Sequence, residues 1–163
     1  MKRRSLITGA AVVCAVAAAA PAASAATEPF GAAYTEKYVG PNAHPACPND
    51  AFACGTGNAD GLGGFTTERG FDEGCSCLVR DLGFPDGSTL NLVEDFVSFT
   101  GPGRSGSSPA PPTSEGHPGT YVLSWTVVDG SGRFAGASGN GTDQYDSAGL
   151  IASGTLSGTI TTP

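Results

Sequence analysis

The chain is short, acidic and rich in glycine and proline, and these properties exclude several classes of function. Its 163 residues carry 15 acidic side chains against 8 basic ones, with a formal net charge of −7. Such a charge repels nucleic acid and anionic membrane surfaces, so we exclude both as main partners. The length suits one domain with a single core, and the 25 glycines and 12 prolines disfavour helices.

The N-terminus has the layout of an export signal. Residues 2–4 are basic, residues 6–20 are almost wholly apolar, and residues 23–25 are the small residues that a signal peptidase needs. The apolar run is shorter than the roughly 20 residues that span a bilayer. We therefore expect a cleaved signal peptide over residues 1–25, exported by the general or the twin-arginine route. The mature part, 26–163, is then a single secreted, extracellular domain with no membrane partner and a formal charge of −10.

Four cysteines remain after the signal peptide: Cys47, Cys54, Cys75 and Cys77. An even number of cysteines in an exported chain predicts two disulfides. A bridge between Cys75 and Cys77 would close a very tight ring on one strand. We therefore expect Cys47 and Cys54 to pair with Cys75 and Cys77, in an order that the sequence leaves open. A zinc site is the alternative, but only His44 lies near these cysteines, and we predict no metal and no cofactor.

Beyond the signal, apolar residues recur at every second position, and this period indicates strands. In chain order, the predicted strands cover residues 30–38, 65–71, 75–81, 88–99, 121–128, 133–146 and 150–161. Seven or eight strands without helices predict a sandwich or a closed antiparallel β-barrel, because open sheet edges invite aggregation. Glycines inside the strands favour a barrel of about eight strands, because they permit the sharp coiling of a small closed sheet.

One long segment breaks this pattern. Residues 100–119 consist mainly of glycine, serine and proline. Such a composition is typical of a flexible loop that folding does not require.

Two segments within residues 127–160 resemble a known family. The first contains Gly130, Ser131, Gly132 and Phe134, followed by Ala137 and Gly139. The second runs from residue 154 to residue 160. Both are similar to segments of bacterial secreted proteins with an allene oxide cyclase-like barrel, and more loosely to plant dirigent proteins. The resemblance implies the barrel fold, and Phe134 is expected to plug one end of the barrel.

Three charged residues interrupt otherwise apolar strand faces. Glu94 falls among large apolar residues of the segment 88–99, and Arg80 and Arg69 do the same in their own segments. A buried charge must be paired, so we expect Glu94 to be buried within salt-bridge reach of Arg80 or Arg69. The pair is either a structural ion pair or a polar anchor in a ligand cavity. Tyr121 and Trp125 are core residues that would line the wall of such a cavity.

These observations leave three functions open. The first is a module that holds a small apolar molecule inside the barrel, bound by Arg69, Arg80, Glu94, Tyr121 and Trp125. The second is a cofactor-free cyclase or isomerase of the allene oxide cyclase or dirigent type, with Glu94 as acid or base and Arg80 as anion partner. The third is a solidly packed extracellular structural or interaction protein. The volume of the cavity separates the third from the others, and the sequence leaves the oligomeric state open.

Overall fold

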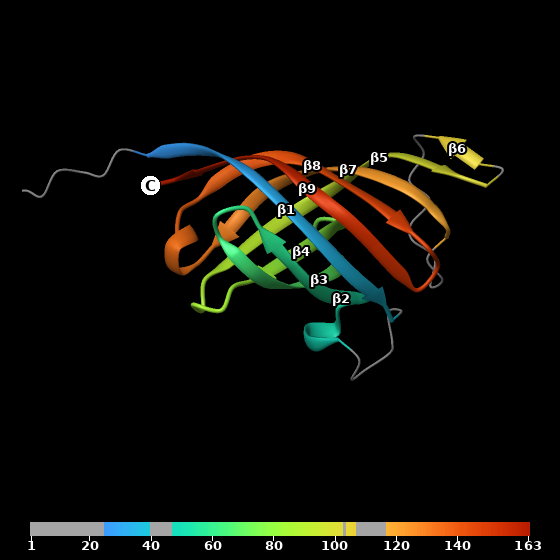
Figure 1. Cartoon of the computed structure of the whole chain (residues 1–163), viewed down its shortest axis with the longest axis horizontal. Helices are drawn as coiled ribbons and strands as arrows, with labels where there is room; N and C mark the ends of the chain where they lie inside the picture. The colour runs from blue at the N-terminus through green and yellow to red at the C-terminus, as the bar shows by residue number, and fades with distance from the viewer. Residues whose placement is uncertain (1–24, 40–46, 103, 107–116) are drawn as a thin grey trace, which may run out of the picture.

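The computed structural model describes residues 25–39, 47–102, 104–106 and 117–163, and these residues form one all-β unit (Figure 1). The predicted signal peptide up to residue 24, His44 and residues 107–116 of the predicted loop lie outside the described residues. Within the described ranges, no helix is long and apolar enough to cross a membrane.

Eight strands close into an antiparallel β-barrel, which confirms the predicted fold class. The described residues contain nine strands, all of which except β6 belong to the barrel: β1 (Ala26–Tyr38), β2 (Ala53–Ala59), β3 (Gly63–Asp72), β4 (Cys77–Gly83), β5 (Thr89–Gly101), β6 (Arg104–Gly106), β7 (Gly119–Gly130), β8 (Ser138–Ser147) and β9 (Ile151–Thr162). The sheet order is β4-β3-β2-β1-β9-β8-β7-β5-β6, and an additional pairing of β4 with β5 closes the barrel. Strand β6 pairs only with the end of β5 and extends beyond the barrel (Figure 1).

Strand β2 is the one strand of the barrel that apolar periodicity does not predict. It contains Gly55 and Gly57 and no large apolar residue. Both glycines are required by the close approach of neighbouring groups. A Cβ atom at Gly55 would collide with the carbonyl oxygen of Thr35, and one at Gly57 with the ring of Phe65 and the carbonyl oxygen of Ala33. The glycines therefore serve close strand contact, which is a recognised use of glycine inside strands.

Two further boundaries differ from prediction. The segment expected to be a strand from residue 133 begins instead with a 3-10 helix, η2 (Gly132–Phe134), and β8 starts only at Ser138. In the predicted loop, β5 continues to Gly101 and forms a hairpin with β6, while β7 already begins at Gly119.

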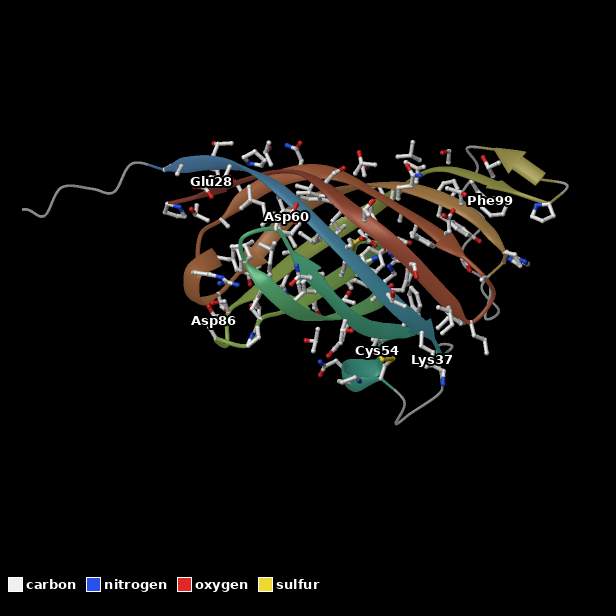
Figure 2. All side chains as sticks on the ribbon, viewed as in Figure 1. Glu28, Lys37, Cys54, Asp60, Asp86 and Phe99 are labelled. Carbon is white, nitrogen blue, oxygen red and sulfur yellow. A yellow bond between two sulfur atoms is a disulfide. The ribbon has the colours of Figure 1, made fainter. Side chains whose placement is uncertain are left out.

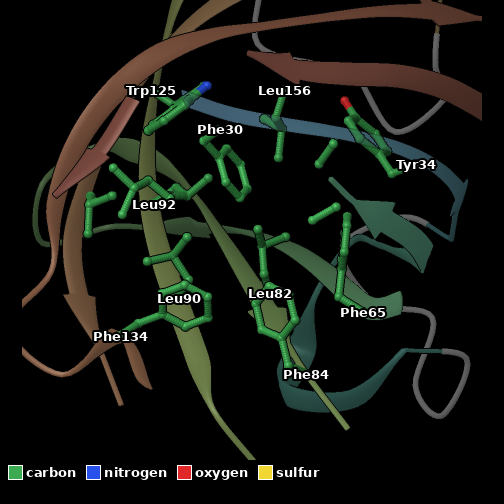
Figure 3. Packing of buried hydrophobic residues seen from close by; sticks show 14 of the residues in the cluster. Phe30, Tyr34, Phe65, Leu82, Phe84, Leu90, Leu92, Trp125, Phe134 and Leu156 are labelled. Atoms are coloured by element: carbon green, nitrogen blue, oxygen red, sulfur yellow. The ribbon is translucent and has the colours of Figure 1, made fainter. Parts of the chain in front are cut away.

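Aromatic and aliphatic side chains fill one end of the barrel (Figure 3). Phe134 is 3% exposed and packs against Phe84, with ring centroids 5.0 Å apart. It closes this end of the barrel as expected. Trp125 meets the ring of Phe30 edge-on at 5.7 Å, deeper inside. Burial of each such side chain stabilises the fold by about 1.5–3 kcal/mol. We call this the plugged end and the opposite end the mouth.

The predicted disulfide pairing is wrong, because the bridges are Cys47–Cys54 and Cys75–Cys77. Strand β3 lies between β2 and β4, and Cys54 is level with Asp81 rather than with Cys77. Adjacent strands are about 4.8 Å apart, so a bridge across two strands would exceed the roughly 7 Å limit between Cα atoms.

The tight ring between Cys75 and Cys77 is compatible with the backbone because the two cysteines do not share one strand. Strand β4 begins only at Cys77. Ser76, between the cysteines, has a φ angle of 57°. This left-handed turn brings the two Cα atoms to 5.2 Å from each other, within the usual range for disulfides. Both bridges lie at the mouth, where Cys54 and Lys37 are seen together (Figure 2).

Candidate functional site

A cluster of buried polar and charged side chains occupies the middle of the barrel. Strands β1, β3, β4, β5 and β8 each contribute at least one inward-facing residue, because inward positions recur at every second residue along a strand. We call this set the charge cluster. Its members are Tyr34, Glu36, Thr67, Arg69, Arg80, Glu94 and Asp143, and none is more than 4% exposed.

Arg80 lies at the centre of the charge cluster, and each of its three nitrogens donates hydrogen bonds. Its Nε donates to Glu94 Oε1 at 2.6 Å. Its Nη1 donates to Glu36 Oε1 and, at 3.0 Å, to Thr67 Oγ1. The Nη2 atom donates to the hydroxyl oxygen of Tyr34 at 3.0 Å and to Asp143 Oδ2 at 2.9 Å. All five N–H groups of the guanidinium therefore have an acceptor.

Arg69 is the direct cross-strand partner of Arg80. Two like charges in this position destabilise a sheet, and shared carboxylates offset the repulsion here. Arg69 Nη2 donates to the same Asp143 Oδ2 at 2.8 Å. Arg69 Nε lies 3.1 Å from Glu94 Oε2, an ion pair without hydrogen-bond geometry. The guanidinium also lies over the ring of Tyr145, 4.5 Å from its centroid.

The prediction for Glu94 is confirmed: it is 1% exposed and forms ion pairs with both Arg80 and Arg69. Asp95, the next residue, is exposed. Tyr121 and Trp125 are buried in the core, as expected. Among described residues, the Nε1 of Trp125 has no hydrogen-bond acceptor.

Sequence reasoning did not single out four members of the charge cluster. Glu36 and Tyr34 belong to the alternating face that begins at Phe30, so this face contained a signal for Glu36. Asp143 carried no such signal, because two of the inward positions before it on β8 are glycines, Gly139 and Gly141. A face of glycines does not look apolar, and a carboxylate on it does not stand out.

The charge cluster holds three carboxyl groups and two guanidinium groups. Burial, partly offset by Arg80, raises the pKa of Asp143 to about 8. Burial also raises the pKa of Glu36, again against the effect of Arg80. Desolvation disfavours the charged form of a carboxyl group. At neutral pH Asp143 is therefore mostly protonated.

A cavity of about 40 Å³ lies at the mouth, next to the charge cluster. Its wall is mainly aromatic and apolar, formed by Tyr38, Phe52, Leu78, Tyr121 and Tyr145. Glu36 and Arg69 also line it, and they are the most deeply buried polar side chains there.

Glu36, which lines this cavity, has one carboxylate oxygen without a hydrogen bond among the described residues. Glu36 Oε1 accepts hydrogen bonds from Thr67 and Arg80, whereas Oε2 accepts none from the described residues. An unpaired buried carboxylate oxygen is costly, and at this position a bound molecule can satisfy it.

The rim of the mouth carries exposed apolar side chains. Leu150 is 56% exposed, and its carbonyl accepts the backbone hydrogen bond of Tyr38. Phe71 is 55% exposed and is the cross-strand partner of Leu78. Each therefore sits beside a residue of the cavity wall and extends the apolar surface outward.

In the described part of the chain, no three histidine, cysteine or carboxylate residues are grouped to hold a metal ion. The chain matches no protein-family model, no curated protein and no solved structure. The likeness to allene oxide cyclase-like and dirigent proteins therefore stays a prediction from the sequence, and the function is argued from the site alone.

Proposed function

We propose that this protein is a secreted β-barrel module that binds a small, mainly apolar molecule at its mouth. The observation that carries the proposal is the Glu36 Oε2 atom, which is buried and has no hydrogen bond among described residues, while Glu36 lines a cavity with an aromatic wall. Pockets for small molecules typically combine apolar walls with a few polar groups that fix orientation. Secretion is supported by the two disulfides, which persist in oxidising compartments.

The ligand binds at the mouth rather than along the whole barrel axis. Core side chains occupy the plugged end, and the charge cluster occupies the middle. A water-sized group needs roughly 10–15 Å³ of such space, so the 40 Å³ cavity accepts only the polar end of a molecule. The apolar remainder then lies against the rim, at Leu150 and Phe71. Of the binding residues expected from sequence, Arg69 and Tyr121 line this cavity, while Arg80, Glu94 and Trp125 support the barrel behind it.

A second candidate is a packed extracellular interaction protein that acts through its outer surface. The extensive filling of the barrel by Trp125, Phe134 and the charge cluster favours it. The cyclase or isomerase alternative receives less support, because Glu94 and Arg80 bind each other and do not line the mouth cavity.

Native mass spectrometry of protein taken from its own culture medium tests the proposal. We expect a co-purifying small molecule that is lost in the variant Ala152→Leu, because Ala152 lines the mouth cavity and a larger side chain fills it. Ala33→Leu is the matched control, since Ala33 is on the outer face of β1. Overpacking costs about 1–3 kcal/mol, so the melting temperature of each variant must be compared. Ligand-free protein that also binds no added small molecule would favour the packed interaction protein.

A further inference from the structure

We infer that the group bound at the floor of the mouth is a hydroxyl, held between Glu36 and Arg69, and that the site rejects carboxylates. This inference rests on the proposed function and adds the chemical class of its ligand. It follows from which atoms of these two side chains are already used.

Glu36 offers an acceptor. Its Oε1 accepts from Thr67 Oγ1 at 2.7 Å and from Arg80 Nη1, and both donors favour the ionised carboxyl group against the effect of burial. Its Oε2 is buried and accepts no hydrogen bond from the described residues. Its free Oε2 therefore requires a hydrogen-bond donor, and a bond to a charged group is stronger than one between neutral groups.

Arg69 offers a donor beside it. Its Nη2 donates to Asp143 and to Tyr34, and its Nε faces Glu94 at 3.1 Å and Glu36 at 3.9 Å. No hydrogen bond among the described residues uses Nη1, although Arg69 lines the cavity. The two N–H groups of Nη1 therefore remain for an oxygen of the ligand.

A hydroxyl is the small group that satisfies both side chains. It donates its hydrogen to Glu36 Oε2 and accepts from Arg69 Nη1. A ketone only accepts, so it leaves the buried carboxylate oxygen unpaired. A carboxylate would meet the charge of Glu36, and the charge cluster has no spare positive charge to offset it, because two arginines face three carboxyl groups.

Three probes of equal chain length separate these cases: 1-hexanol, 2-hexanone and hexanoate. Each is titrated into the mature protein at pH 7, and binding is followed by nuclear magnetic resonance shifts of Tyr38, Tyr121 and Tyr145. We expect 1-hexanol to bind about tenfold or more tightly than either other probe, which is the effect of one hydrogen bond to a buried charge.

The variant Glu36→Gln tests the assignment to one residue. Its amide can donate, so the preference for 1-hexanol over 2-hexanone should fall to about twofold or less, or reverse. Asp95→Asn makes the same chemical change on the outer face and should keep the wild-type preference. If Glu36→Gln does not fold, the wild-type ranking still decides the question.

The possible results distinguish failure of the hydroxyl assignment from failure of the proposed binding function. Equal or tighter binding of 2-hexanone or hexanoate to the wild type overturns the hydroxyl assignment and leaves binding at the mouth in place. If none of the three probes shifts a tyrosine resonance of the mouth, both are overturned.

Discussion

Arg80 donates its Nε hydrogen to Glu94 Oε1, at 2.6 Å, across the strand pair that closes the barrel. The other nitrogens of the same guanidinium bind side chains of β1, β3 and β8. One side chain therefore links β4 to four other strands through the barrel interior. Such a link favours the closed barrel over an open sheet, because opening the pair β4–β5 would separate Arg80 from Glu94 and break their ion pair.

Replacing Glu94 by alanine should destabilise the domain by about 3–5 kcal/mol, because it leaves Arg80 Nε buried without an acceptor. Glu94→Gln should cost less, since the amide oxygen can still accept from Arg80. Urea unfolding followed by Trp125 fluorescence measures both changes.

Asp95 provides the control for Glu94 at the neighbouring position. It is exposed on the outer face of β5, so Asp95→Asn should change stability by no more than about 0.5 kcal/mol. If Glu94→Ala and Asp95→Asn lower the free energy of unfolding by the same amount, the ion pairs of Glu94 do not stabilise the domain.

We expect the hydroxyl group of Tyr34 to stabilise the folded domain through its hydrogen bonds alone. It donates to Asp143 at 2.7 Å and accepts from Arg80 and Arg69. Tyr34→Phe keeps the ring, which lies 4.2 Å from the Arg80 guanidinium, and should destabilise the domain by about 1–3 kcal/mol.

Tyr38→Phe is the comparison for this change, because Tyr38 lies four residues further along β1 and is only half-buried. It should leave the free energy of unfolding nearly unchanged. Equal effects of the two substitutions would mean that the hydrogen bonds of Tyr34 are matched by water in the unfolded chain.

Alternation of apolar residues was enough to predict the barrel and the ion pairs of Glu94. The pattern works because each strand has one face in the core, so a charge at an inward position stands out against its neighbours. It fails for β2 and for Asp143. There the inward or closely packed positions are glycines, whose role is to leave room for the Thr35 carbonyl or the Trp125 ring.

The disulfides could not be read from the sequence for a different reason. Their pairing depends on which strands are neighbours and in which register, and β2 was missing from the predicted order. Once β2 is placed between β1 and β3, Cys54 lies two strands from Cys77. Cysteine spacing alone contains no information on that separation.

Peptide mapping can check the two bridges without a structure. Trypsin cuts the denatured, non-reduced protein after Lys37, Arg69 and Arg80, so each bridge lies within one peptide, 38–69 or 70–80. Each peptide should gain the mass of two hydrogens on reduction. A single species that contains both peptides and separates on reduction would show the crossed pairing instead.

The stability of this domain should fall as the pH rises from about 4 to about 8. Burial raises the pKa of Asp143 from 3.8 to about 8, so in this range the folded protein holds a proton that the unfolded chain has lost. Stability falls with pH wherever the unfolded state binds fewer protons, by up to about 1.4 kcal/mol per pH unit for one group. Glu36, whose pKa burial also raises, acts with the same sign. Urea unfolding at intervals of one pH unit measures the slope.

Asp143→Asn identifies the group responsible. The asparagine cannot titrate, so this variant should show a much shallower decline between pH 4 and pH 8, with only the contribution of Glu36 remaining. The free energy of unfolding of this variant, relative to that of the wild type, should increase up to about pH 8. Above that pH, Asp143 of the wild type is deprotonated in both the folded and the unfolded state, and the difference stays constant. A wild-type stability that instead rises from pH 4 to pH 8, as for carboxylates held ionised by salt bridges, would show that Asp143 is ionised in the folded barrel.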